Sequence, residues 1–406
     1  MTSPAETVDS SFDVVVVGGG NGGISAAARL LKKGVRDVAV LEPNDVHTYR
    51  PLLSYVGGGQ ADLRSAERTQ RSVTPKGCTW LRDSAVGVDA EARTVRCASG
   101  RTLRYRDLVL APGLVPDTDE LPGVDAAMAS PAVASNYLDA ADKTWDVVQR
   151  MPLGGHAVFT VPRPPVSCTG TTMKPLFLAA AHWLRTRRLS TVEMTLVVDR
   201  PTLLDAPALD GRIRAELRDL GVKVLYQTAV TGLFPEGRHI TVTDRRDGTV
   251  RPISYDMLHL VPPFRGPRWL SVSGLAADDA AGVADVDPST MRHRRHPNVW
   301  GVGDGASVET DPSGGALRPQ VSIMVDNLVA ARSGGTTVAD HYDGYTVAPI
   351  ATDARHLIAG EFTRDGALAS SLPSFLDPLR PRRVAWAFDR FGLPQIYWNL
   401  LLRGRL

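Results

Sequence analysis

The sequence has little cysteine, almost no net charge and no long hydrophobic run. Its 406 residues contain three cysteines, Cys78, Cys97 and Cys168. This number excludes a fold held by many disulfides, and the spacing matches no zinc site. Lysine and arginine (46) nearly balance aspartate and glutamate (44), so the net charge of +2 gives no reason to expect nucleic-acid binding. No uncharged run approaches the roughly 20 apolar residues that span a bilayer.

The N-terminus lacks the apolar core of a secretory signal. Its first residues, MTSPAETVDSSFD, are polar, and a low cysteine content suits a reducing compartment. We therefore expect a cytoplasmic protein, or one bound peripherally at the inner face of a membrane. The length predicts two or more domains with large cores.

The first motif present is a glycine-rich turn after a short apolar run. Residues 14–17 are all valine, which is typical of a buried parallel strand. Gly18, Gly20 and Gly23 then form G-x-G-x-x-G. The first glycine permits a tight turn, the second lets the backbone approach a pyrophosphate, and the third lets the following helix pack closely.

The residues after this turn complete a dinucleotide-binding unit. The pattern predicts a helix over residues 21–33, whose N-terminus would face the phosphates. Glu42 ends the next strand, 19 residues after Gly23 (42 − 23), where a carboxylate can accept ribose hydroxyls. We therefore predict a bound dinucleotide.

Two later segments favour FAD over NAD. The apolar strand at 299–302 ends in Gly303 and Asp304, and such a carboxylate can bind the ribitol chain that NAD lacks. Another strand ends in the glycine turn at 111–113. A helix is predicted to begin near Pro319, and its N-terminus could stabilise a reduced flavin. An ordinary packing helix is the alternative.

A second strand–helix–strand pattern lacks the glycine turn. The apolar strand at 156–161 is followed by PRPPVSCTG, and a later strand ends at Asp199. Prolines remove N–H groups and fix φ, so this loop cannot cradle phosphates as a glycine loop does. We predict that the second domain keeps the fold and has lost nicotinamide binding.

Over residues 11–404 the chain resembles the sulfide:quinone oxidoreductases, in particular the branch that includes the mitochondrial enzymes. The resemblance rests on VVGGGNGGISAAARLL, LEPNDVHTYRPLLSYVGGG, YDMLHLVPP, DVDPSTMRHRRHPNVWGVGD, HYDGYTVAPI and YWNLLLRG, in the family's order. It implies an FAD flavoprotein in which sulfide reacts at a cysteine pair and electrons pass through FAD to quinone.

The resemblance places the first redox cysteine at Cys168, but the second position is Ala348. Gly305 likewise stands where relatives often have cysteine. A single thiol lacks the leaving thiolate that attack on a disulfide requires. Cys168 could form a mixed disulfide with a small thiol, carry a persulfide, or have no redox role. Lys174 is either an aid to lowering the pKa of this thiol or an exposed lysine.

The same resemblance places Pro51 beside the flavin ring. His47, in the same segment, is either a proton shuttle or a loop residue bonded to backbone. Cys168 is the predicted catalytic residue. The predicted cofactor-binding residues are Gly18, Gly20, Asn21, Gly23, Glu42, Pro51, Ala111, Gly113, Gly303, Asp304, Pro319 and Gln320.

The last 29 residues, 378–406, place arginines among Trp, Tyr and Leu. This composition suits a membrane interface, and in the family the region helps to form the quinone site. An amphipathic segment buried on the protein's own body or in a homodimer is the alternative.

Together these patterns predict an α/β fold with two Rossmann-like domains. The FAD-binding domain would comprise residues 11–122 and 284–350, the second domain 123–283, and a C-terminal quinone- or membrane-facing region 351–406. The predicted activity is oxidation of sulfide or a small thiol or persulfide, through FAD, with quinone as acceptor. The alternative is a diverged flavoenzyme that acts on another small molecule, such as a biosynthetic intermediate, with oxygen or quinone as acceptor.

Overall fold

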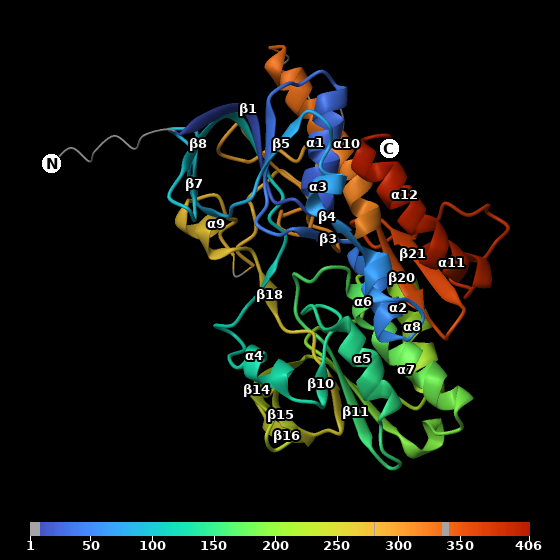
Figure 1. The fold of residues 1–406 in the computed structure, drawn as a ribbon. Coiled ribbons are helices and arrows are strands. Elements are labelled where there is room, and N and C mark those ends of the chain that lie inside the picture. The colour runs from blue at the N-terminus through green and yellow to red at the C-terminus, as the bar shows by residue number, and fades with distance from the viewer. Residues whose placement is uncertain (1–8, 280, 335–340) are drawn as a thin grey trace.

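The structure is a computed structural model that describes residues 9–279, 281–334 and 341–406. The first eight residues, where we expect no signal, and residues 335–340 of the predicted FAD-binding domain lie outside these ranges. Figure 1 shows one sheet layer above and a second below, with the C-terminal segment along one flank of both.

The larger sheet has a parallel centre and an antiparallel edge. Its strand order is β5-β2-β1-β8-β7-β6, and β19 also pairs with β8. The strands are β1 (Ser10–Val17), β2 (Val38–Leu41), β5 (Cys78–Leu81), β6 (Ala85–Asp89), β7 (Thr94–Cys97), β8 (Thr102–Leu110) and β19 (Val299–Gly301). One edge of β8 pairs with β1, while the other pairs first with β7 and then with β19.

The smaller sheet is parallel, in the order β10-β17-β11-β12-β13. Its strands are β10 (Val133–Ala134), β11 (His156–Val161), β12 (Glu193–Val198), β13 (Lys223–Leu225) and β17 (Met257–His259). An antiparallel sheet of β14 (Thr228–Phe234), β15 (His239–Asp244) and β16 (Val250–Ser254) packs beside it.

Three short pairs of antiparallel strands lie outside the sheets described above. They are β3 (Val46–Thr48) with β4 (Glu67–Thr69), β9 (Val115–Pro116) with β18 (Phe264–Arg265), and β20 (Thr346–Ala351) with β21 (Leu357–Phe362). The β9–β18 pair lies where the chain passes between the two sheets (Figure 1).

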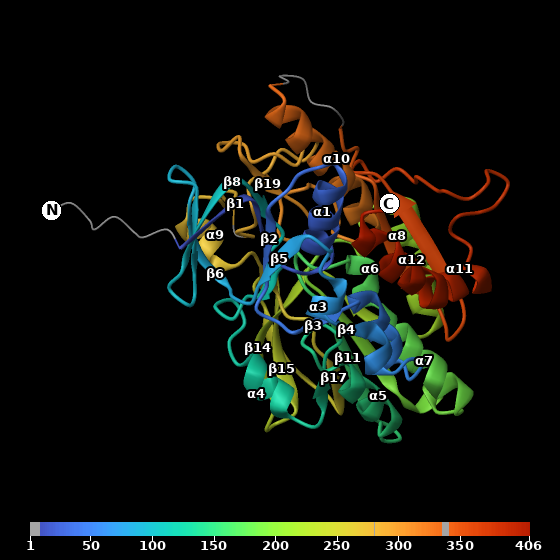
Figure 2. The same cartoon turned by 45° about the horizontal axis from the view of Figure 1, so that its top comes forward.

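Helices cover the sheets and the flank. They are α1 (Asn21–Lys32), α2 (Leu53–Gly57), α3 (Gln70–Val73), α4 (Val124–Ala129), α5 (Ala141–Gln149), α6 (Thr169–Thr172), α7 (Lys174–Arg185), α8 (Pro207–Asp219), α9 (Arg268–Val272), α10 (Gly314–Arg332), α11 (Arg383–Ala387) and α12 (Leu393–Asn399). A π-helix at Phe388–Gly392 joins α11 to α12. α11 packs against β21, and α12 follows on the same flank of the molecule (Figure 2).

Each sheet has its own apolar core, as the alternation of side chains across a strand requires. Val14 and Val16 of β1 face α1 and α10, whereas Val15 and Val17 face β6 and β7. The core of the second sheet extends to Ala348 in β20. The predicted α/β class with Rossmann-like sheets is confirmed.

One predicted helix boundary was wrong. The helix expected to begin near Pro319 begins at Gly314, so Pro319 lies inside α10. The reason is the cap: the Ser313 hydroxyl accepts a hydrogen bond from the Ala316 N–H at 3.0 Å. This bond fixes the first turn ahead of the proline.

Candidate active site

The glycine turn after β1 is built by close backbone contacts. Gly18 has φ +100°, and a Cβ there would lie 2.1 Å from the Ala111 carbonyl oxygen. A Cβ on Gly23 would lie 1.8 Å from the Gly18 carbonyl oxygen. A Cβ on Gly20, in contrast, would meet no protein atom within 4 Å. The chain itself needs the first and third glycines, and the second leaves the N-terminus of α1 open to a pyrophosphate, so the turn fits a dinucleotide.

Glu42 lies at the end of β2, as predicted, and holds the turn. One carboxylate oxygen accepts the Gly19 N–H at 2.8 Å, and the other accepts the Asn44 N–H at 2.8 Å. Each carboxylate oxygen can accept more than one hydrogen bond, so room for a ribose hydroxyl remains.

The other predicted cofactor segments converge on this turn. A Cβ on Gly22 would lie 3.5 Å from side-chain atoms of Ala111, Val302 and Leu317. A Cβ on Gly305 would lie 2.7 Å from the Gly113 carbonyl oxygen. The end of β8, the end of β19 and the start of α10 therefore surround one point, although they are far apart in sequence.

Gln320 is buried and holds the turn at Gly303, which follows β19. Its Oε1 accepts the Gly303 N–H at 3.0 Å, and its Nε2 lies 3.4 Å from the Tyr342 hydroxyl. Burial raises the pKa of the neighbouring Asp304 carboxyl above the usual value, and the side chain of Ser167, which lies near this carboxyl, opposes the increase. Asp304 thus links the FAD segments to the cysteine loop.

The remaining predicted residues occupy less specific positions. Asn21 is the first residue of α1, and its Oδ1 accepts the Ser25 hydroxyl at 3.2 Å. Pro51 lies in a half-buried 3-10 turn at 50–52. The neighbouring Arg50 guanidinium donates to the Tyr137 carbonyl at 2.8 Å.

His47 is a structural bridge, which agrees with the second of the two roles considered above. Its Nδ1 lies 2.9 Å from the Gly19 carbonyl and its Nε2 lies 2.5 Å from the Tyr397 hydroxyl. Burial lowers the pKa of the imidazole. His47 therefore ties the glycine turn to α12, a contact across 350 residues that no local pattern signals.

Cys168 lies at the start of α6 with a left-handed backbone (φ 56°). The Thr171 hydroxyl donates to its sulfur at 3.1 Å, and the thiol points to the Val347 carbonyl at 3.7 Å. Burial raises the pKa of this thiol to about 12, and the Asp311 carboxylate adds to the increase. The group is therefore a neutral thiol in this environment.

Lys174 does little to lower the pKa of the Cys168 thiol. Its ammonium is fully buried and forms an ion pair with Asp389 at 2.8 Å. The Tyr55 hydroxyl donates to the same carboxylate at 2.5 Å. The exposed alternative considered for Lys174 is therefore wrong, and its charge is already neutralised beside α2.

Ala348 lies directly beside the cysteine loop. A Cβ on Gly170 would lie 2.7 Å from the Ala348 Cβ, and Val347 carries the carbonyl that faces the Cys168 thiol. The position matched to the second redox cysteine is thus adjacent to Cys168 in space, but it carries no sulfur. Cys78 in β5 and Cys97 in β7 belong to the larger sheet, and all three thiols are free.

The carboxyl edge of the smaller sheet is closed by ion pairs. Arg163 bridges Asp117 (3.0 Å) and Glu120 (2.5 Å), and Arg245 lies 2.8 Å from Asp199. The cavity left at this edge is about 20 Å³, enough for about one water molecule. This edge is where a parallel α/β sheet would bind a nucleotide.

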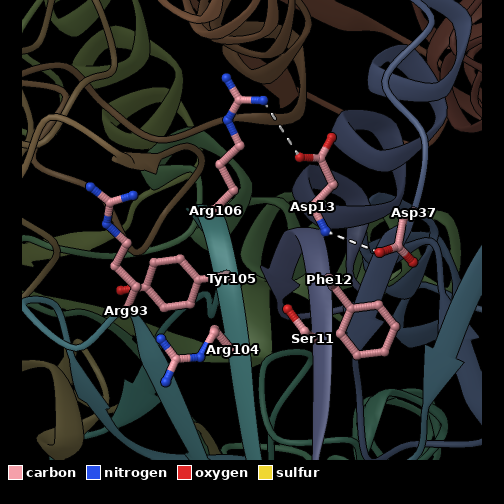
Figure 3. Close-up of a pocket in the computed structure, with 8 residues that line it drawn as sticks. All are labelled: Ser11, Phe12, Asp13, Asp37, Arg93, Arg104, Tyr105 and Arg106. Carbon is pink, nitrogen blue, oxygen red and sulfur yellow. Dashed lines mark hydrogen bonds and ion pairs between the residues drawn. The ribbon is translucent and has the colours of Figure 1, made fainter.

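A larger hollow of about 480 Å³ lies elsewhere (Figure 3). It is lined by Ser11, Phe12, Asp13, Asp37, Arg93, Arg104, Tyr105 and Arg106. These residues are at the amino end of β1, opposite the glycine turn, so the hollow is not part of the cofactor site. Arg106 and Asp37 both contact Asp13 there.

Within residues 9–279, 281–334 and 341–406, no helix combines the length and the apolar composition that a membrane span requires. In the same part of the chain, no group of three or more His, Cys, Asp or Glu side chains is arranged to hold a metal.

Comparisons with known proteins agree with this site. The pyridine nucleotide-disulphide oxidoreductase family matches residues 12–151. The mouse mitochondrial sulfide:quinone oxidoreductase is 30% identical over 402 residues, which cover 98% of this chain and 88% of that protein.

Solved structures share the fold across the whole chain. The sulfide:quinone oxidoreductase of Aquifex aeolicus superposes with a TM-score of 0.77 at 17% identity, covering 97% of this chain and 91% of that one. A chain of the Tetrahymena thermophila mitochondrial ATP synthase gives 0.84 at 19% identity, covering 100% and 99%.

The glycine turn, the converging FAD segments and the full-length similarity lead to one family. The predicted resemblance and the predicted cofactor are confirmed: this chain is an FAD-dependent oxidoreductase that belongs to the sulfide:quinone oxidoreductase family.

Proposed function

We propose that the protein oxidises sulfide, or a small thiol or persulfide, at Cys168 and passes two electrons through FAD to a quinone. The observation that carries this proposal is the meeting of the cysteine loop with the predicted FAD segments, where Thr169 bonds to Asp311 and Ser167 lies near Asp304. Similarity to sulfide:quinone oxidoreductases over 98% of the chain supports the choice of substrates. In this proposal the twelve residues predicted from sequence, from Gly18 to Gln320, hold the cofactor.

One thiol is sufficient for a balanced reaction. The Cys168 thiol and H₂S together lose two electrons and two protons, an S–S bond forms, and the quinone becomes quinol. FAD, when bound, supplies the two-electron acceptor between the sulfur and the quinone. A small thiol can then take the outer sulfur as its own persulfide and restore Cys168.

An anaerobic sulfide titration followed by the visible flavin absorbance tests this proposal. We expect stoichiometric bleaching that a soluble quinone reverses, and loss of bleaching in Cys168→Ser. Cys97→Ser is the matched control, because Cys97 is buried in the larger sheet and should leave bleaching intact. NADH should leave the flavin oxidised, because ion pairs close the second sheet's edge. Full bleaching of Cys168→Ser by sulfide would refute the role of the thiol.

Ala348 favours a second candidate function. Its Cβ packs against α6 where a second sulfur would be expected, and burial keeps Cys168 protonated. A family member without sulfide chemistry would act on another small molecule, with oxygen or quinone as acceptor. An FAD-loaded protein that sulfide never bleaches would support this candidate.

The C-terminal segment supports a membrane-facing role, the setting in which quinones dissolve. Four apolar side chains, the C-terminal apolar patch, are at least half exposed: Phe375 (83%), Val384 (72%), Phe388 (52%) and Phe391 (57%). Arginines flank them, as suits an anionic membrane surface. We propose that this patch lies against a membrane, and that residues 351–406 form a region distinct from the domains 11–122 with 284–350 and 123–283.

A further inference from the structure

Asp311 approaches the cysteine loop from a distant part of the chain. It lies between β19 and α10, yet its two carboxylate oxygens lie 3.3 and 3.2 Å from the Thr169 N–H nitrogen. The Thr169 hydroxyl also donates to Asp311 at 2.5 Å. Thr169 is fully buried and follows Cys168 directly. One carboxylate therefore holds the residue next to the thiol at two points.

The backbone at this turn needs such support. Cys168 has φ 56°, a region that non-glycine residues occupy at some cost in free energy. Other contacts hold one side of this turn: the Thr171 hydroxyl donates to the sulfur, the Thr171 N–H donates to the Cys168 carbonyl at 2.9 Å, and the Tyr137 hydroxyl donates to the Ser167 carbonyl at 3.0 Å. The bonds from Thr169 to Asp311 fix the other side of the same turn.

Cations near Asp311 have other partners. Arg200, which is 5% exposed, donates to the Thr169 hydroxyl at 2.8 Å and pairs with Asp205 at 2.7 Å. Lys174, on the other side of the thiol, pairs with Asp389. The remaining charged neighbours of this region are Asp304 and Arg50.

We propose that Asp311 is a positioning residue that holds the Cys168 turn and, through its negative charge, favours the thiol over the thiolate at Cys168. The inference builds on the proposed role of Cys168, but its test needs no turnover. Burial raises the pKa of the Asp311 carboxyl to about 6. The carboxylate is therefore charged at neutral pH and loses its charge in mild acid, where its effect on the thiol should disappear.

The test measures how fast Cys168 reacts with methyl methanethiosulfonate from pH 5 to pH 8. It uses the FAD-loaded full chain in a Cys78→Ser, Cys97→Ser background, so that only one thiol responds. In Asp311→Asn the amide oxygen can still accept from Thr169, while the charge is gone. We expect equal rates near pH 5 and a roughly threefold faster reaction at pH 8. A pKa about one unit lower gives tenfold more thiolate, which lower nucleophilicity partly offsets.

Two control variants and one fallback variant make the result decisive. Glu309→Gln, which removes an exposed carboxylate two residues before Asp311, should follow the parent at every pH. Asp311→Glu, which restores the charge, should return the parent profile. If Asp311→Asn releases FAD or unfolds at a lower temperature than the parent, Asp311→Ser replaces it. The same quantity is then compared, namely the ratio of the variant rate to the parent rate at pH 5 and at pH 8. A rate ratio that does not change between pH 5 and pH 8 would overturn the electrostatic role. Sulfide bleaching is measured separately, so a failure of the proposed function would be distinguishable.

Discussion

At the scale of single residues, the glycine turn separates what the fold needs from what the cofactor needs. Gly18 is held in a left-handed conformation against the Ala111 carbonyl. Gly20 is the second glycine of the same motif, but no protein atom lies within 4 Å of the position that its Cβ would occupy. A methyl group added at the two positions should therefore have different consequences.

We predict that Gly18→Ala prevents stable folding of the FAD half, because the Cβ would lie 2.1 Å from a carbonyl oxygen. Gly20→Ala should change the free energy of unfolding of the apoprotein by less than about 1 kcal/mol, the scale of an N-cap change. It should nevertheless weaken FAD binding, because the methyl group occupies space that the pyrophosphate needs. Thermal melting of apoprotein and FAD titration separate the two effects. A Gly20→Ala protein that binds FAD as tightly as the parent would contradict this assignment.

Local residue patterns predicted this turn because every contact in it is short in sequence or set by the strand order. The contacts that orient Cys168, and the contact that joins the glycine turn to α12, were not predictable in the same way. Asp311 and Thr169 are 142 residues apart, and His47 and Tyr397 are 350 residues apart. An aspartate in a polar loop carries no pattern that distinguishes it from other surface carboxylates.

At the scale of elements, one buried ion pair joins the start of α7 to the π-helix near the C-terminus. Lys174 is fully buried and Asp389 is 5% exposed, and Tyr55 of α2 bonds to the same carboxylate. Three elements therefore meet at one charge pair, six residues after Cys168.

We predict that Lys174→Met lowers the free energy of unfolding by about 3–5 kcal/mol, because Asp389 would keep a buried charge without its partner. The double variant Lys174→Met, Asp389→Leu should recover most of this loss, since it removes both charges. Arg212→Ala, which breaks the half-exposed pair with Glu216, is the control and should cost less than about 1 kcal/mol. Urea unfolding with saturating FAD measures all three. Equal losses of unfolding free energy for Lys174→Met and Arg212→Ala would show that the buried ion pair stabilises the protein no more than the half-exposed one.

Element positions were predicted better than element ends. The strands at residues 14–17, 156–161 and 299–302 were located by their apolar runs and by the turn residues that follow them, which act locally. The start of α10 was misplaced because Pro319 is a common first-turn residue, whereas the Ser313 cap had no equally strong sequence signal.

At the scale of the whole molecule, the C-terminal segment has two different faces. Tyr397 and Trp398 of α12 are buried against His47 and Tyr49. The C-terminal apolar patch points outward from the neighbouring turns. Packing on the protein's own body, one of the alternatives considered from the sequence, therefore applies to Tyr397 and Trp398, and a membrane interface stays a prediction for the outward-facing residues.

We predict that Val384→Glu with Phe388→Glu weakens binding to anionic lipid vesicles at least tenfold. Burial of each apolar side chain is worth roughly 1.5–3 kcal/mol, and the new charges repel the surface. Flavin reduction by sulfide in solution should not change. Val272→Glu, at an exposed apolar position (77%) on α9, is the control. Cosedimentation with the vesicles measures this binding. Equal binding of the double variant and the control would show that the C-terminal apolar patch does not contact the membrane.

The pairing of β8 has a consequence for the newborn chain. The edge of β8 that does not pair with β1 stays open beyond β7 until residues 299–301 form β19. Arg332 of α10 then forms ion pairs with Asp107 on β8 and with Asp13 on β1. While the ribosome is still making the middle of the protein, that edge is unpaired and able to join a foreign strand. The FAD half, although it is begun first, is therefore completed late in synthesis, and a chain stopped before residue 299 should be captured by chaperones without flavin.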